Sequence, residues 1–193
     1  MAMGKSELRA LTLGRRRAMS DQERDDAAEA LAAHLAALPV AAGAQRIACY
    51  VSMTYEPDTR PILAALLNRG IRVIVPIALP SKQLDWVALS ADAEFVQTTM
   101  GTHEPEGERL GSGAIAGVDL VVVPALAVDH RGYRLGRGAG YYDRALAQAS
   151  APTAALLFNS EIIDEVPHEP HDVPVTMAIT PSGVFRVLQE NTR

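Results

Sequence analysis

The run VDLVVVP, residues 118–124, constrains the fold more than any other stretch of this chain. It is almost entirely apolar and rich in β-branched side chains, without the polar alternation of a half-exposed strand. Such a run is typical of a strand buried on both faces, which requires helices on either side of a parallel or mixed sheet. The run therefore predicts an α/β architecture in which it forms a central strand.

Short apolar runs elsewhere alternate with helical patterns, as the same architecture requires. We expect strands over residues 46–52, 71–79, 84–89, 153–158 and 175–180, the last of these closing the sheet. We expect helices over residues 59–70, ended by Gly70, and 141–149. The predicted fold is a three-layer α/β/α domain with a mostly parallel or mixed sheet.

Two helices are predicted before the first strand. In the first, beginning near Lys5, one face carries Leu8, Leu11 and Met19. Cations occupy the rest of that helix, namely Lys5, Arg9 and Arg16. The second begins after Ser20, because Ser20 and Glu23 form a capping-box pattern, and it ends near Pro39. The first helix is therefore basic and amphipathic, and a solvated charged face is its simplest interpretation.

Composition bounds the kind of protein. With 193 residues, 48% of them hydrophobic, the chain suits one domain over residues 1–193. A net charge of -5 gives no overall basic field, so we expect neither a nucleic-acid nor a membrane partner. The lone Cys49 lies in an apolar run and is expected to pack as a small hydrophobe. Without a signal-like segment or a run of about 20 apolar residues, we expect a cytoplasmic protein. A monomer or a weak homo-oligomer is expected as well.

The segment GYRLGRGAGYYDR, residues 132–144, follows the central strand, where open α/β sheets collect their ligands. Its alternating glycines allow the backbone amides to turn toward an anion. Arg134 and Arg137 add donors suited to phosphate, and Asp143 is explained if Mg²⁺ lies between it and the phosphates. The residues predict a nucleotide-phosphate cradle with metal, although the spacing matches neither the dinucleotide fingerprint nor the P-loop. The alternative is a tight surface turn with solvated arginines.

Two further segments attract attention. Residues 97–117 form the longest irregular region, and such loops are often functional. The HEPH segment, residues 168–171, superficially suggests a pair of metal-binding histidines. Its proline disfavours the helix that would bring the two rings together, so we do not expect a transition-metal site there.

The glycine-rich segment strongly resembles the signature of the 5-formyltetrahydrofolate cyclo-ligase family, whose members are also called 5,10-methenyltetrahydrofolate synthetases. Other motifs of that family occur in the same order over nearly the whole chain. These are KSELR (5–9), YVSMTYEPDT (50–59), HEP (103–105) and HDV (171–173). One departure is Ala139, where relatives often carry Gly or Lys, and a missing Lys there would alter nucleotide affinity.

The resemblance implies an enzyme of folate and one-carbon metabolism that uses ATP and Mg²⁺ to close 5-formyltetrahydrofolate to 5,10-methenyltetrahydrofolate. It implies ATP binding by Lys5, Arg9, Arg134, Gly136, Arg137, Gly138, Ala139, Gly140, Tyr141 and Tyr142. It implies folate binding by Val51, Glu56, Arg137 and Tyr141, with Glu56 receiving two N–H groups of the pterin. Arg137 and Tyr141 would be catalytic, and Asp143 and Asp172 would hold Mg²⁺.

Alternatives remain for single residues and for the whole chain. Glu56 could instead be an acid that precedes helix 59–70, with Asp58 or Thr59 as the N-cap. The tyrosines could merely pack. The chain could be a sugar-phosphate isomerase-like enzyme on a similar scaffold, or a nucleotide- or folate-binding protein without turnover.

Overall fold

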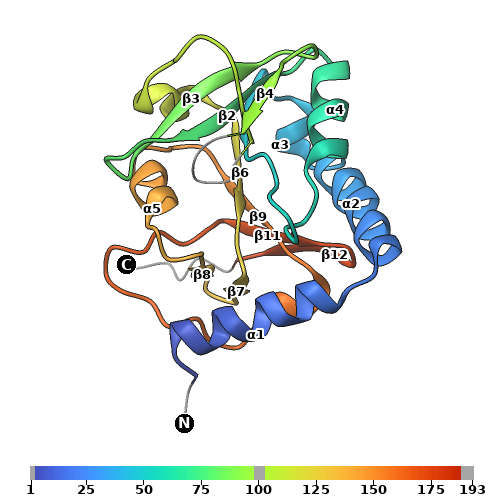
Figure 1. Ribbon diagram of the computed structural model, residues 1–193, viewed down its shortest axis with the longest axis vertical. Coiled ribbons are helices and arrows are strands. Elements are labelled where there is room, and N and C mark those ends of the chain that lie inside the picture. Colours follow the sequence, from blue (N-terminus) through green and yellow to red (C-terminus); the bar gives the residue numbers. More distant parts are fainter. Residues whose placement is uncertain (1–2, 98–102, 188–193) are drawn as a thin grey trace.

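The computed structural model describes residues 3–97 and 103–187 (Figure 1). Its helices are α1 (Lys5–Ala18), α2 (Asp21–Ala36), α3 (Pro39–Ala42), α4 (Arg60–Asn68) and α5 (Tyr141–Leu146), with 3-10 turns η1 (Ser112–Gly117) and η2 (Asn159–Glu161). Its strands are β1 (Arg46–Cys49), β2 (Arg72–Ala78), β3 (Leu84–Leu89), β4 (Phe95–Gln97), β5 (His103–Pro105), β6 (Leu120–Pro124), β7 (Ala127–Asp129), β8 (Arg134–Leu135), β9 (Thr153–Leu156), β10 (Ile162–Ile163), β11 (Met177–Thr180) and β12 (Gly183–Arg186).

The main sheet has seven strands in the order β12-β11-β9-β6-β1-β2-β3. The five inner strands are parallel, and β3 and β12 pair antiparallel at the two edges. From β1 the chain adds β2 on one side and then returns to add β6 on the other. The sheet is thus mixed, as predicted, and its order reverses between β1 and β6, the kind of switch point where such folds bind ligands.

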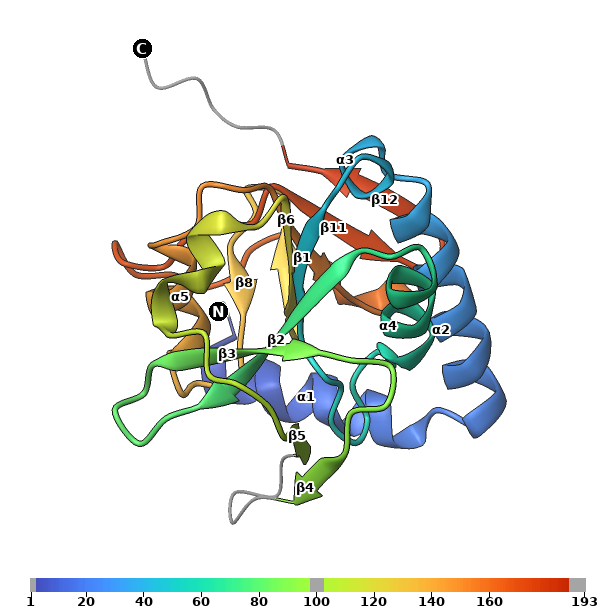
Figure 2. The ribbon, with the colours of Figure 1, turned by 90° about the horizontal axis from the view of Figure 1, so that it is seen from above.

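Helices cover both faces of this sheet (Figure 2). On one face α2 and α4 contact the strands, and their apolar side chains form a core with β1 and β6 that includes Leu31, Leu35, Ile62 and the buried Cys49. On the other face α5 and η1 pack against β3, around the fully buried Trp86. The three-layer prediction is confirmed, and Cys49 packs as a small hydrophobe whose burial raises the pKa of its thiol.

The helix α1 belongs to neither layer and crosses the sheet at the edge where the parallel strands end (Figure 1). Leu8 packs there against Leu126 and Leu135, beside the small sheet β10-β7-β8. The expected apolar face is wrong in two respects: Leu11 is exposed, whereas Arg16 is buried. An ion pair with Glu161 explains the burial of Arg16, because a paired charge can leave solvent where a single one cannot.

Several predicted boundaries differ from the structure. The first strand ends at Cys49, not at residue 52, and α5 ends at Leu146, not at residue 149. The segment expected to close the sheet is followed by β12, which turns back at the edge. The irregular region 97–117 contains β5 and η1, and its residues 98–102 lie outside the described part. The capping box of Ser20 and Glu23 is confirmed.

The conformation of Gly132, the first residue of segment 132–144, tests whether this segment requires glycine. Its φ of 87° is left-handed, and a Cβ would overlap the carbonyl oxygen of Val175. We expect Gly132→Ala to lower the free energy of unfolding by about 3 kcal/mol, since strained conformation and steric overlap add. Gly14→Ala, in open space inside α1, is the matched control and should raise it by about 1 kcal/mol. Urea unfolding measures both, and equal effects would contradict this account.

Candidate active site

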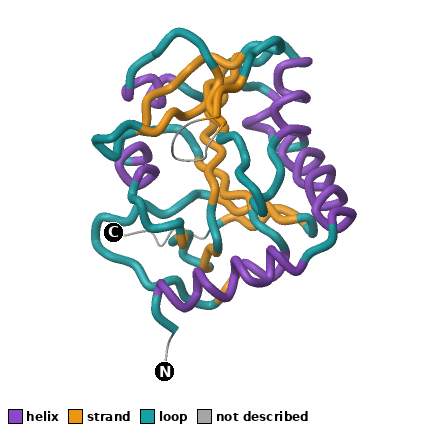
Figure 3. The backbone as a smooth tube through the Cα atoms, in the orientation of Figure 1, coloured by secondary structure: helices purple, strands orange, loops and turns teal. Residues whose placement is uncertain are grey.

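A cavity of about 570 Å³ lies at the switch point between β1 and β6. Val51, just after β1, and Ala125, just after β6, form part of its wall, and the end of β2 contributes Ala78. Figure 3 shows that the chain beyond these strand ends runs as loops. Loops there can present polar groups that the strands themselves use for pairing. The cavity is therefore where the sheet topology predicts a ligand.

Every residue predicted to bind nucleotide, folate or metal lines this cavity. They are Lys5, Arg9, Val51, Glu56, Arg134, Gly136, Arg137, Gly138, Ala139, Gly140, Tyr141, Tyr142, Asp143 and Asp172. These residues come from α1, from the loop after β1, from the segment between β8 and α5, and from the loop before β11. The fold thus brings together residues that the sequence separates by up to 167 positions.

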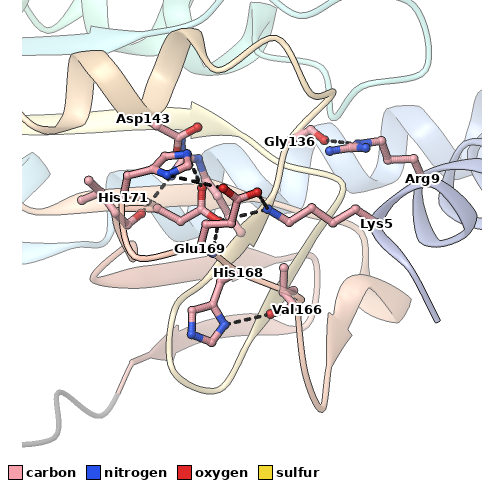
Figure 4. Close-up of polar contacts among 11 residues, drawn as sticks. Lys5, Arg9, Gly136, Asp143, Val166, His168, Glu169 and His171 are labelled. Carbon is pink, nitrogen blue, oxygen red and sulfur yellow. Dashed lines mark hydrogen bonds and ion pairs between the residues drawn. The ribbon is translucent and has the colours of Figure 1, made fainter. Parts of the chain in front are cut away.

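The glycine-rich loop, residues 136–140, contacts α1 directly. Arg9 Nε donates a hydrogen bond of 2.9 Å to the Gly136 carbonyl oxygen (Figure 4). Gly138 has a φ of 101°, and a Cβ on it would lie 3.3 Å from the guanidinium of Arg9. Any larger residue would be strained and would crowd Arg9. Glycine at this position therefore allows the basic helix to approach the loop, so the face of α1 that carries Arg9 is not merely solvated.

Glu56 and Arg137 meet in the cavity as an ion pair. Arg137 Nε donates to Glu56 Oε1 at 2.9 Å, and the Met53 N–H donates to Oε2 at 2.9 Å. The carboxylate is buried, with 6% of its side chain exposed, whereas the Arg137 side chain is 41% exposed. Asp58 accepts the Arg60 N–H at the start of α4, so the alternative role of Glu56 as the helix-initiating acid is not needed.

Two aspartates line the cavity near α1 and α5, and each has a cationic partner. Arg134 Nη2 donates to Asp143 Oδ1 at 2.7 Å, while its Nη1 donates to the Val173 carbonyl oxygen at 2.9 Å. Lys5 Nζ lies 3.1 Å from Asp172 Oδ2. Burial would raise the pKa of Asp172, but the Glu169 N–H and Lys5 outweigh it and hold that pKa below its ordinary value.

These two carboxylates are the candidates for a metal. Within residues 3–97 and 103–187, no three His, Cys, Asp or Glu side chains gather as a metal cluster. Two carboxylates nevertheless fit Mg²⁺, which takes its remaining ligands from water and substrate phosphates. His168 stacks on Tyr133 at 3.7 Å between ring centres, whereas His171 lines the cavity beside Asp172. The two histidines therefore stand in different surroundings.

The adjacent tyrosines take different positions, as expected for neighbouring residues. The Tyr141 hydroxyl donates to the Leu79 carbonyl oxygen at 3.3 Å and lies at the β2 side of the cavity. Tyr142 packs against both apolar cores. Burial and the Glu56 carboxylate together keep the pKa of Tyr142 well above its ordinary value, so it stays a neutral phenol.

Sequence reasoning missed several cavity residues. Glu104, on β5 in the HEP motif, lines the cavity and accepts the Ala78 N–H, and nothing in the motif itself predicts this position. Glu169 and His171 also line it. Pro76 and Pro124 lie near the ends of parallel strands that border the switch point. Their positions could have been found from the predicted strand ends, because these ends meet at one edge of the sheet.

The profile of the 5-formyltetrahydrofolate cyclo-ligase family matches residues 2–181. The chain belongs to this family. A cyclo-ligase of Mycolicibacterium smegmatis is 38% identical over 187 residues, covering 92% of this chain and 93% of that one. The cyclo-ligase of Mus musculus is 32% identical over 183 residues, covering 89% and 90%.

Solved structures agree with this family membership. The 5,10-methenyltetrahydrofolate synthetase of Aquifex aeolicus superposes with a TM-score of 0.84 at 29% identity, covering 99% of this chain and 96% of that one. The resemblance and the α/β fold are thus confirmed, and the chain is an enzyme of the cyclo-ligase family. This finding favours the cyclo-ligase over the isomerase-like and non-catalytic alternatives. No helix in the described part of the chain is long and apolar enough to cross a membrane.

Proposed function

We propose that the chain converts 5-formyltetrahydrofolate and ATP, with Mg²⁺, into 5,10-methenyltetrahydrofolate, ADP and phosphate. The observation that carries this proposal is one cavity that holds a glycine-rich loop, cations from α1 and a buried carboxylate. The glycine-rich loop and the cations suit the phosphates of a nucleotide, and the buried carboxylate can accept N–H groups of a pterin. Both substrates would then meet within one cavity, which a direct phosphoryl transfer between them requires.

The nucleotide phosphates would lie along residues 136–140, against α1. Arg9 already contacts this loop, and Lys5 and Arg137 line the same cavity. Guanidinium groups suit phosphate because they offer two parallel donors. Arg134 would contribute by holding Asp143, to which it is hydrogen-bonded.

Asp143 and Asp172 would hold Mg²⁺ between the protein and the phosphates. When bound, the ion would neutralise charge on the oxygens of the transferred phosphoryl group. The chain's own part is to hold both carboxylates in position at the wall of the cavity. Lys5 serves that purpose for Asp172, and Arg134 serves it for Asp143.

The pterin would bind at Glu56, with Val51 and Tyr141 beside it. A carboxylate accepts two adjacent N–H groups in a fork, and burial makes those bonds more selective. The Arg137 guanidinium, already at Glu56, would lie between the pterin and the phosphates. This placement agrees with a residue that serves both substrates.

The reaction would proceed in two steps that balance. The formyl oxygen attacks the γ-phosphorus of ATP, and ADP leaves. N10 then attacks the activated formyl carbon and loses its proton, and phosphate departs with the former formyl oxygen. Positioning and cationic charge supply most of what the phosphoryl transfer requires.

A direct assay tests the proposal. Purified protein is mixed with 5-formyltetrahydrofolate, ATP and Mg²⁺, and methenyltetrahydrofolate is followed by its near-ultraviolet absorbance, with ADP measured in parallel. We expect one ADP for each methenyltetrahydrofolate formed. Absence of product under conditions where a known cyclo-ligase is active would refute the proposal.

Removal of divalent metal should slow the reaction by about a hundredfold or more, because a metal ion is worth several kcal/mol of charge stabilisation in such transfers. Chelation followed by titration with Mg²⁺ measures this effect. Asp172→Asn should raise the Mg²⁺ concentration needed for half-maximal rate, and Glu165→Gln, an exposed acid outside the cavity, should not. An unchanged rate in chelator would contradict the metal assignment.

A further inference from the structure

Arg16 is a buried charged residue on α1 that lies outside the cavity. Its Nε and Nη2 each donate to a different oxygen of Glu161 at 2.7 Å, and Nη2 also donates to the Ala125 carbonyl oxygen at 2.7 Å. The side chains of Arg16 and Glu161 are 2% and 4% exposed. Glu161 also accepts the Phe158 N–H at 2.9 Å. The guanidinium is therefore held by directional bonds on several sides.

These contacts join α1 to the ends of two central strands. Ala125 directly follows β6 and lines the cavity, and Phe158 and Glu161 follow β9. The guanidinium also lies over the Phe158 ring, 5.4 Å from its centre. A guanidinium that makes two parallel hydrogen bonds to a carboxylate allows its helix little sliding or rotation, whereas apolar packing allows more. The pair can thus fix where α1 sits along the sheet edge.

Arg16 shares a helix face with the two cations that reach the cavity. Lys5, Arg9 and Arg16 are separated by four and seven residues, which places them in line at 3.6 residues per turn. Their contacts agree with this, since Arg9 bonds Gly136 and Lys5 bonds Asp172. About 16 Å of helix separates Arg16 from Lys5 at 1.5 Å per residue. A slip of α1 at Arg16 would therefore displace both cations.

We propose that Arg16 and Glu161 are a positioning pair that sets the register of α1 and so places Lys5 and Arg9 for the nucleotide phosphates. The inference rests on the proposed function of the cavity. It differs from a contribution to stability alone, because replacing a buried ion pair by apolar residues is often neutral for stability. Stability and nucleotide binding should therefore separate when the pair is replaced.

The test replaces both residues, as Arg16→Met with Glu161→Met. The midpoint of thermal unfolding should fall only modestly, because no charge is left buried alone and only the Ala125 carbonyl and the Phe158 N–H lose a partner. The KM for ATP should rise about tenfold, whereas the KM for 5-formyltetrahydrofolate should change less than about twofold, since only the α1 contacts are displaced. Arg17→Met, at an exposed arginine on the same helix, removes one positive charge from α1 without touching the pair and should leave both KM values unchanged.

Arg16→Lys, which keeps the charge but loses the two parallel donors of the guanidinium, should raise the KM for ATP about threefold. This variant provides the test if the double variant does not fold. A parental KM for ATP in the folded variants, or an equal rise in both KM values, would overturn the inference. Direct titration with Mg²⁺ and ATP separates it from the proposed function. If the parent protein binds ATP but forms no methenyltetrahydrofolate, the proposed function is refuted. The change in the Kd for ATP between the parent and the Arg16 variants would still test the role of Arg16.

Discussion

Arg137→Ala is expected to lower kcat/KM for ATP by about a thousandfold, because an arginine that stabilises a transferring phosphoryl group contributes a factor of this order. Arg137 is the cavity cation that contacts the candidate folate carboxylate, at 2.9 Å. Removing it leaves the phosphate charge less neutralised and takes from Glu56 its cationic partner. Steady-state kinetics with each substrate varied in turn measure the loss.

Arg131→Ala is the matched control for this change. Arg131 is exposed to a similar degree, 46% against 41%, and is also ion-paired, with Asp129, but it does not line the cavity. Its replacement should leave kcat/KM within about twofold of the parent. Comparable losses in both variants would mean that Arg137 acts through general stability and not at the phosphates.

Glu56→Gln should raise the KM for 5-formyltetrahydrofolate by about thirtyfold, with a much smaller effect on the KM for ATP. The estimate follows from the roughly 1.5–3 kcal/mol of a hydrogen bond to a charged group, at about 1.4 kcal/mol for each factor of ten. Glutamine keeps the size of the side chain but presents one donor where the pterin offers donors only. Kinetics or direct titration with the folate measures the change.

The two substitutions together form a crossed test. Arg137→Ala should act mainly on phosphoryl transfer from ATP, seen in kcat, and Glu56→Gln mainly on folate binding, seen in the KM for 5-formyltetrahydrofolate. The reverse pattern would show that the two ends of the cavity have been assigned the wrong way round. Glu165→Gln, which changes an exposed acid, controls for the loss of one negative charge.

Much of the fold could be predicted because its signals are local. The continuous apolar run at residues 118–124 became β6, in the middle of the sheet, and Ser20 with Glu23 marked the start of α2. Lys5, Arg9, Val51, Glu56 and Asp172 could be predicted only through the family resemblance, but the cavity residues of segment 132–144 could be predicted because glycines, arginines and an aspartate cluster there after a strand. Each of these patterns reflects interactions within a few residues, which sequence shows directly.

Other features depend on contacts between distant residues, which a single sequence does not display. Arg16 looked solvated because its partner Glu161 is 145 residues away. The pairing of Glu56 with Arg137 spans 81 residues. Likewise β12 is short, and it exists as a strand because β11 offers it an open edge. The two ion pairs and the strand β12 all depend on tertiary contacts and not on local conformational preference.

The position of α1 has a consequence for the newly made chain. Lys5, Arg9 and Arg16 are synthesised before their partners, which are Asp172, Gly136 and Glu161 respectively. During synthesis α1 cannot pack against the sheet, and its cations stay without their partners, until the strands of the sheet have emerged and paired. The nucleotide end of the cavity therefore cannot be completed until Asp172 has been synthesised.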